Sequence, residues 1–245
     1  MSKFTEKPEV STAAQEKKVA SGVGRLLRDS FGRGPEAAHT KLADNYVLIL
    51  LKGFLSPMEK VIVDEKGPDA LHSIREMMME EITTDIRHEV EKVTGYTFND
   101  FFFDWNIDKK TGILIGLKPY AYEDAGEYSY SLVKDFPHKD ALEEKIAYLS
   151  SLAERRPDSC TSVKIDKRTF LVVREGILVA IEKKMIEMGI ENSLKVAKRY
   201  VEKELLNESD NLSSILGVQI DEIFVDWNFK KDLSTIVIIT EDYPD

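Results

Sequence analysis

The tripeptide Asp104-Trp105-Asn106 occurs again as Asp226-Trp227-Asn228, and these two copies hold both tryptophans of the 245-residue chain. The copies are 122 residues apart, which is about half of the chain. The same offset pairs Gly95 with Gly217, Phe102 with Phe224 and Lys109 with Lys231. Further towards the N-terminus the offset becomes 123, and it matches Gly53-Phe54-Leu55 to Gly176-Ile177-Leu178 and Glu59-Lys60 to Glu182-Lys183. A period of this length predicts a tandem duplication of a module of roughly 100 residues.

Helix and strand signals give each module the order α-β-β-α-α-β-β. The form Thr12-Ala13-Ala14-Gln15 is that of a capping box, so a helix is expected to begin there and to end at Gly32. Ser56 and Pro57 open a short second helix, and Pro68 opens a long third one that ends at Gly95. Strands are expected at Ala37 to Ala43, at Tyr46 to Lys52, at Phe101 to Ile107 and at Ile113 to Leu117.

The alternation of side chains along a strand places Trp105 in the core, together with Phe103 and Ile107. The Met77-Met78-Met79 run has helical spacing and is interpreted as core filler. The second module is predicted to have helices at Ala141 to Glu154, Leu178 to Met188 and Asn192 to Leu216, and strands at Thr161 to Ile165, Thr169 to Glu175, Ile220 to Phe229 and Thr235 to Glu241.

These elements predict an α+β fold of two homologous repeats, each a mostly antiparallel sheet with packed helices. The expected organisation is a disordered N-terminus at 1–11, a first repeat at 12–117, a connector at 118–138 and a second, diverged repeat at 139–245. The connector contains Tyr120, Tyr122, Tyr128 and Tyr130, and its tyrosines are expected to pack across both repeats.

Composition excludes several classes of partner. A formal charge of −10 disfavours nucleic acid and anionic membrane surfaces, because phosphate binding needs a concentrated basic surface. No apolar run approaches the ~20 residues of a membrane helix, and no apolar signal segment follows Met1, so a cytoplasmic protein without direct membrane insertion is expected. The single cysteine, Cys160, permits no internal disulfide and is interpreted as a buried, unreactive thiol.

No catalytic, metal or cofactor motif stands out. The four histidines, His39, His72, His88 and His138, have no ligand spacing with one another or with Cys160. The chain has no Gly-x-Ser-x-Gly elbow, Walker loop or dinucleotide fingerprint. We therefore expect a protein that is not an enzyme and that carries no catalytic residues, metal or cofactor.

The loop Gly32-Arg33-Gly34-Pro35 is one candidate binding site. Arg33 is a permanently charged fork between two glycines at a helix end, which suits a carboxylate, bicarbonate or phosphate. The alternative is that the glycines end the helix and that the arginine interacts with its C-terminal dipole.

Two further sets of residues recur in both repeats and are candidates for a structural role or for a partner site. Glu59 has a capping explanation, but Glu182-Lys183 persists where Val179-Ala180 replaces Ser56-Pro57. The polar residues around the tryptophans are interpreted as bonding to nearby backbone, with a shared partner site as the alternative. The complete set is Glu59, Lys60, Glu182, Lys183, Asp104, Asn106, Asp226 and Asn228.

Four features together resemble a known bacterial family. They are Phe31 to Pro35, Leu51 to Lys60, Arg75 and the turn Asp108-Lys109-Lys110-Thr111-Gly112. The first repeat is similar to the small domain named for the MpsC component of the sodium-translocating, membrane-potential-generating system, although Ser56 replaces the family's threonine. The resemblance covers about Ala14 to Leu117, and the second repeat departs from it with Glu154-Arg155-Arg156-Pro157 in place of the glycines.

The resemblance implies a non-enzymatic bacterial accessory protein of a membrane system linked to cation movement and inorganic-carbon uptake. It implies an integral membrane transport subunit as a partner, with homo-oligomerisation as a further option. Because family members commonly have one such domain, this chain resembles a covalent pseudo-dimer. The alternative function is a module that senses a small anion or a nucleotide near Arg33 or between the repeats.

Overall fold

A computed structural model describes residues 11–121, 128–130, 132, 134–208 and 210–241 of the chain. The first repeat consists of α1 (Thr12–Phe31), β1 (Ala37–Leu42), β2 (Tyr46–Lys52), α2 (Pro57–Lys66), α3 (Pro68–Thr94), β3 (Asp100–Asn106) and β4 (Thr111–Leu117). The second consists of α4 (Lys139–Ala153), β7 (Ser159–Lys164), β8 (Thr169–Glu175), α5 (Ala180–Glu187), α6 (Glu191–Asn207), α7 (Asp210–Leu216), β9 (Ile220–Asn228) and β10 (Leu233–Thr240).

Each repeat forms its own four-stranded antiparallel sheet. The strand orders are β1-β2-β4-β3 and β7-β8-β10-β9, so the two sheets have the same topology. In both, the strand that carries the tryptophan lies at the edge and pairs with the last strand of its repeat, with Trp105 opposite Gly112 and Trp227 opposite Ser234. The prediction of an α+β fold built from two repeats is confirmed.

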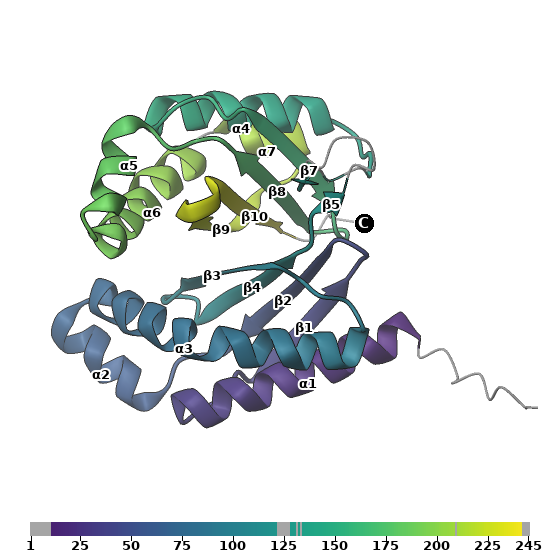
Figure 1. Ribbon diagram of the computed structural model, residues 1–245, viewed down its shortest axis with the longest axis vertical. Coiled ribbons are helices and arrows are strands. Elements are labelled where there is room, and N and C mark those ends of the chain that lie inside the picture. The colour runs from purple at the N-terminus through teal and green to yellow at the C-terminus, as the bar shows by residue number, and fades with distance from the viewer. Residues whose placement is uncertain (1–10, 122–127, 131, 133, 209, 242–245) are drawn as a thin grey trace, which may run out of the picture.

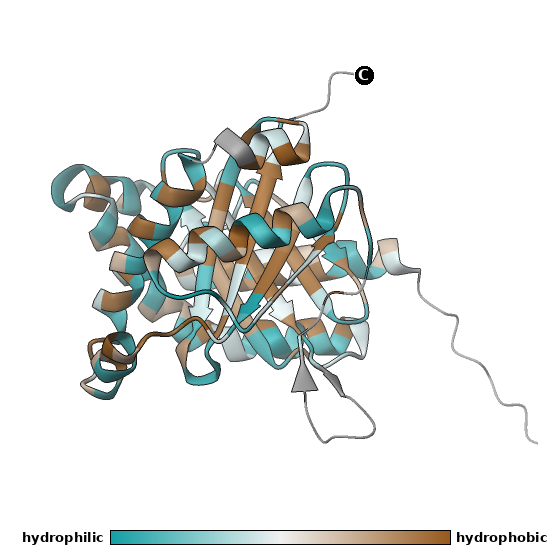
Figure 2. Ribbon diagram, turned by 90° about the horizontal axis from the view of Figure 1, so that it is seen from above, coloured by the Kyte–Doolittle hydropathy of each residue, from teal (hydrophilic) through white to brown (hydrophobic). Residues whose placement is uncertain are grey.

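The two sheets pack face to face in the middle of the molecule, and the helices cover their outer faces (Figure 1). A central core fills the space between the sheets, and β2 contributes to it from one face and to the outer core of its repeat from the other. The residues of the central core that belong to the two repeats are Tyr46, Leu48, Phe102, Ile113, Ile115, Leu117, Val163, Leu171, Val173, Phe224, Leu233, Val237 and Ile239. The apolar strands stand out in Figure 2, where α4 crosses over them.

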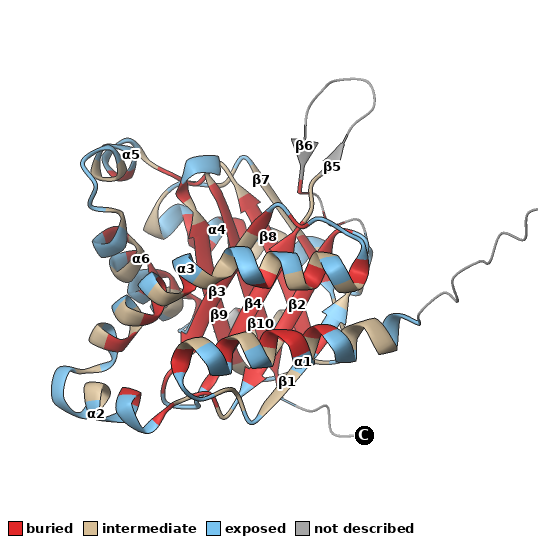
Figure 3. Cartoon of the chain, turned by 60° about the horizontal axis from the view of Figure 1, so that its bottom comes forward, coloured by how far each residue is buried: buried red, intermediate tan, exposed pale blue. Residues whose placement is uncertain are grey.

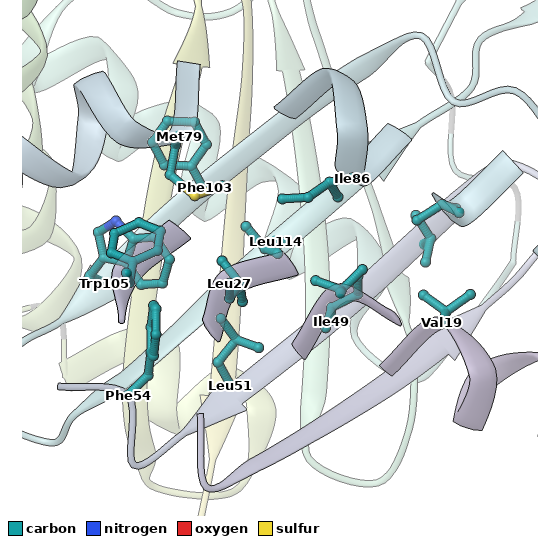
Figure 4. Packing of buried hydrophobic residues seen from close by; sticks show 14 of the residues in the cluster. Val19, Leu27, Ile49, Leu51, Phe54, Met79, Ile86, Phe103, Trp105 and Leu114 are labelled. Atoms are coloured by element: carbon teal, nitrogen blue, oxygen red, sulfur yellow. The ribbon is translucent and has the colours of Figure 1, made fainter. Parts of the chain in front are cut away.

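A second kind of core lies between each sheet and its helices. In the first repeat Val19, Val23 and Leu27 of α1 contact the outer face of the sheet, which the 3.6-residue period of the helix allows. Figure 4 shows Phe54, Met79, Phe103 and Trp105 grouped at one end of this core. Figure 3 shows the strands buried and the outward faces of the helices exposed.

Helix ends follow the sequence signals with one correction. The first helix begins at Thr12 as predicted, but Ser11 is its N-cap and accepts a long hydrogen bond of 3.4 Å from the backbone N–H of Ala14. Ser56 caps α2 as predicted, since its hydroxyl accepts from Glu59 N while the Glu59 carboxylate accepts from Ser56 N.

Three further expectations need correction. The helix predicted at Asn192 to Leu216 is divided into α6 and α7, because the run from Asn207 to Asn211 is rich in residues that compete with the helical backbone. Of the methionine run, only Met79 is fully buried, whereas Met77 is exposed. The connector also contains a two-stranded sheet, β5 (Tyr120–Ala121) and β6 (Tyr128–Ser129), which no sequence signal indicated.

The connector contacts both repeats where the structure describes it. The Tyr130 hydroxyl donates to Asp100 of the first repeat, and Leu132 N donates to Thr161 of the second at 3.2 Å. Both Tyr130 and Leu132 belong to the central core. Tyr122, which was expected to pack across the repeats, lies outside the described residues. Residues 1–10 of the N-terminus, which was expected to be disordered, lie outside them as well.

Candidate functional site

The two repeats meet along their tryptophan-bearing edge strands, and two aspartates join them reciprocally. Asp226 accepts a hydrogen bond from the backbone N–H of Phe103 at 2.9 Å, and Asp104 accepts one from Val225 at 2.9 Å. Phe103 and Val225 occupy equivalent positions, as do the aspartates, so the contact has approximate two-fold symmetry. Asp104 and Asp226 therefore bond to backbone as predicted from their spacing, but to the backbone of the other repeat.

The same aspartates anchor a row of basic side chains on one face of α6. Arg199 Nε lies 3.0 Å and Lys203 Nζ 2.6 Å from the carboxylate of Asp104, while Lys195 Nζ lies 3.1 Å from Asp226. Lys195 also donates to Glu76 of α3. The result is a buried ionic network that spans the two repeats.

Burial and charge oppose each other in this network. Burial alone would raise the pKa of the fully buried Asp104, but Lys203 and Arg199 hold that pKa below its ordinary value. Burial disfavours the charged form of Lys195, but Asp226 and Glu76 raise its pKa. Despite burial, nearby carboxylates, Asp104 first, likewise raise the pKa of Arg199, so Lys195 and Arg199 remain charged.

The network is asymmetric although its frame is symmetric. The α6 residues Lys195, Arg199 and Lys203 stand 123 residues after His72, Glu76 and Glu80 of α3, so equivalent positions carry bases in one repeat and mainly acids in the other. At the contact between the repeats, α6 therefore contributes positive charge and α3 contributes mainly negative charge.

A cleft of about 600 Å³ opens beside this network, between the start of α3 and the second half of α6. Its lining includes Pro68, Asp69, His72, Trp105, Asn106, Asp108, Arg199, Tyr200, Lys203, Asp221 and Ile223. The Tyr200 hydroxyl donates to Asp69 across it. The volume suits a small organic molecule.

His72 is a partly buried polar group in the lining of the cleft. Burial, and then the nearby charge of Arg199, lower the pKa of His72 to about 4, so the imidazole is neutral at physiological pH. Its Nδ1 is buried and has no hydrogen-bond partner within the described residues.

Glu59 and its counterpart Glu182 have mainly internal roles. Glu59 accepts from Arg75 at 2.8 Å, and the Arg75 side chain is 1% exposed and lies 4.7 Å above the rings of both Phe54 and Trp105. In the second repeat Glu182 pairs with Lys198 at 2.8 Å, at the position equivalent to Arg75. Burial raises the pKa of Glu59, but the hydrogen bond and charge of Arg75 bring it below its ordinary value.

The lysines and asparagines of the predicted set lie nearer the surface. Lys60 is exposed, whereas Lys183 lies 3.3 Å from Asp232. Asn106 accepts from Lys109 N at 3.1 Å, and Asn228 accepts from Lys231 N at 3.3 Å, so both close the turns that follow their strands. Asn228 also donates to Asp100 of the other repeat at 2.9 Å.

The loop Gly32 to Pro35 lies away from the contact between the repeats. Gly32 ends α1 in the left-handed conformation, and Arg33 donates to Glu36 at 2.9 Å while remaining 44% exposed. Pro35 lines a wide depression of about 660 Å³ between α1 and β1 that also includes Arg25 and Arg28. Binding of an anion there stays a prediction.

The spacing of the tryptophans identified Asp104 and Asp226, but sequence reasoning missed their basic partners on α6. Lys195, Arg199 and Lys203 recur at intervals of four, which places them on one helix face, and this signal could have been found. Within the described ranges, no cluster of three or more histidine, cysteine or carboxylate side chains is arranged to hold a metal ion.

Comparison with known proteins gives one result. A family model described as "Na+-translocating membrane potential-generating system (MpsC)" matches residues 12–117 and again residues 140–242. No curated protein and no solved structure gives a significant match. Among the described residues, no helix has both the length and the apolar character that crossing a membrane requires.

Proposed function

Since the chain belongs to the MpsC family, with one family domain in each repeat, we propose that it is a non-enzymatic cytosolic accessory component of a bacterial membrane system for cation translocation or inorganic-carbon uptake. The observation that carries this proposal is the double family match, because the family description names a membrane system. An integral membrane subunit is the partner that the proposal requires.

Exposed apolar side chains at equivalent positions support a partner-binding role. Met58 of α2 is 76% exposed, and its equivalent Ile181 of α5 is 70% exposed. Met77 and its equivalent Tyr200 are also exposed. Figure 1 shows α2 and α5 at the same end of the molecule. Large apolar groups thus lie exposed at equivalent positions of both repeats, where a folded monomer gains little from them.

The test is an affinity pull-down from gently solubilised membranes of the host, at two salt concentrations, with identification by mass spectrometry. We expect an integral membrane protein that is retained at high salt, because apolar contacts are not screened. The double variant Met58→Glu/Ile181→Glu should lose it. The matched control is Tyr148→Glu/Leu152→Glu, which changes exposed apolar residues of α4. Recovery of no membrane protein by the unaltered chain would contradict the proposal.

The cleft between the repeats supports a second candidate, the sensing of a small anion or nucleotide. Its volume and the positions of Arg199 and Lys203 favour this function, although both bases are already paired with Asp104. Calorimetry with bicarbonate, phosphate and nucleotides tests it. Loss of binding in Tyr200→Ala would locate the ligand in the cleft, and loss in Arg33→Ala would locate it at the glycine loop. If none of these ligands gives binding heat, the proposal of an anion or nucleotide sensor is wrong.

A further inference from the structure

The core beneath the helices of the second repeat contains a polar cluster that the first repeat lacks. At five equivalent positions, Ser150, Glu154, Arg174, Glu202 and Ser234 replace Leu27, Phe31, Leu51, Met79 and Gly112. The strand registers support this equivalence, since Arg174 lies opposite Ser234 and Leu51 lies opposite Gly112. Four of these residues lie in α4, α6, β8 and β10, and Glu154 is the residue that directly follows α4.

Arg174 is the centre of the cluster and is 1% exposed. Its guanidinium donates to Ser150 at 2.7 Å, to Glu202 at 2.6 Å and to Ser234 at 2.6 Å. Glu202 also accepts from Trp227 Nε1 at 3.0 Å. In the first repeat Met79 occupies the position of Glu202, and Trp105 Nε1 is buried without an acceptor among the described residues.

Lys198 brings two more carboxylates into the cluster. It donates to Glu182 at 2.8 Å and to Glu154, and it lies 3.9 Å from Glu202. Glu154 is the residue that follows α4, its side chain is 2% exposed, and its Oε2 has no hydrogen-bond partner within the described residues.

The charges of this cluster do not balance when every group is ionised. Glu154, Glu182 and Glu202 would carry three negative charges against two positive charges on Arg174 and Lys198. An excess charge buried in this way is unfavourable, and proteins normally avoid it by binding a proton. Glu154 is the group that can accept it, because its Oε2 receives no hydrogen bond from the described residues and, once protonated, can donate one to Glu202.

We propose that the second repeat contains a buried proton-binding site, in which Glu154 holds one proton next to Glu202, and that loss of this proton at alkaline pH loosens the end of α4. The ligand is the proton itself, and the site exists only in the second repeat. It is independent of the identity of the membrane partner.

The surroundings of Glu154 support this site. The charged or titratable groups that face it are Glu182 of α5, Lys198 and Glu202 of α6, and Arg174 of β8. Burial, together with the hydrogen bond to Glu202 and its charge, raises the pKa of Glu154 to about 9. Burial opposes ionisation of Glu202 as well, but Arg174 keeps its pKa below the ordinary value. Of the two carboxyls, Glu154 is therefore the one that holds the proton, and Glu202 is the ionised one.

The direction of the pH effect follows from linkage. A carboxyl whose pKa is higher in the folded than in the unfolded state stabilises the fold most below its unfolded pKa, and that stabilisation is lost as pH rises through the folded pKa. The backbone N–H of Glu154 donates to Ser150 at 2.9 Å, so the charge would develop at the last turn of α4. The protection of the amides in this turn against hydrogen exchange, relative to the intrinsic rate at each pH, should therefore fall towards pH 9.

The test is an infrared titration of the full chain, which follows the carbonyl band of a protonated carboxyl. We expect the band at pH 7, its loss near pH 9, and its absence in Glu154→Gln. Glu144→Gln, an exposed residue of the same helix, should keep it. Glu76→Gln is a second control, because burial and then Asp226 also raise the pKa of Glu76.

Two results would overturn the proposal: no protonated-carboxyl band in the unaltered chain at pH 7, or a band of full intensity in Glu154→Gln. If Glu154→Gln does not fold, the titration of Glu76→Gln decides, since a band that vanishes near pH 9 in that variant supports the site and no band contradicts it.

Discussion

At the scale of single residues, the buried pair of Glu59 and Arg75 shows how far sequence reasoning reaches. The spacing of Ser56 and Glu59 predicts the cap, and the structure contains it. The recurrence of Glu182 without the cap indicates a second role, but not which residue it serves. Arg75 is sixteen positions away, on another helix, and only the packing of α2 against α3 brings it to Glu59. Contacts of this kind depend on tertiary geometry that no local pattern encodes.

Glu59→Ala should therefore destabilise the protein strongly. It leaves the buried guanidinium of Arg75 without its carboxylate, which costs about 3–5 kcal/mol. Urea unfolding followed by circular dichroism measures the change in the free energy of unfolding. Lys60→Ala is the control, because this neighbouring side chain is exposed and should change stability by less than about 0.5 kcal/mol. Equal effects of both variants would show that the pair contributes little.

At the scale of elements, the sequence predicts most of each repeat because its helices and strands obey local rules. Strand β2 matches the expected Tyr46 to Lys52, and its two apolar faces indicate cover on both sides. The sequence does not reveal which element covers each face, because a helix layer and a second sheet can bury the same apolar side chains. The face-to-face packing of the sheets thus had to come from the structure. The polar cluster around Arg174 was missed for a related reason, because its members are far apart in the sequence.

The two short helices provide a matched pair for a prediction about capping. Ser56 accepts a hydrogen bond at the start of α2, whereas Val179 at the start of α5 has no side-chain acceptor. Val179→Ser should stabilise the protein and Ser56→Ala should destabilise it, each by about 1 kcal/mol. Thermal unfolding monitored by circular dichroism gives the sign of each change. A loss of stability in Val179→Ser would mean that packing of the valine outweighs the cap.

At the scale of the whole molecule, the two repeats form one body through the central core and the reciprocal aspartate contacts. Further bonds cross between the repeats near the strand ends, where Lys109 pairs with Asp221 and Lys231 with Asp100. Lys109 and Lys231 are equivalent positions, but their partners are one residue out of register, since Glu222 is the equivalent of Asp100. The duplication is visible in the sequence, but this arrangement of the copies is not.

The ionic network predicts unequal effects for two equivalent substitutions. Asp104 pairs with Arg199 and Lys203, whereas Asp226 pairs with Lys195, which keeps Glu76 as a second partner. Asp104→Asn should therefore destabilise by about 3–5 kcal/mol and Asp226→Asn by less. Chemical unfolding measures both, with the exposed Asp108→Asn as control. Equal losses would indicate that the backbone bonds, rather than the ion pairs, hold the repeats together.

The opposite charges at equivalent positions of α3 and α6 have a consequence for the history of the molecule. Arg199 and Glu76 are equivalent positions that lie 3.8 Å apart, so in a symmetric pair of identical modules a basic residue at this position would face its own copy. Once both copies lie in one gene, each can change alone, and one helix can become basic while the other becomes acidic. The two sides of the fused protein therefore differ in charge. A partner can bind it in one defined orientation, whereas a symmetric pair of identical modules would offer two equivalent orientations.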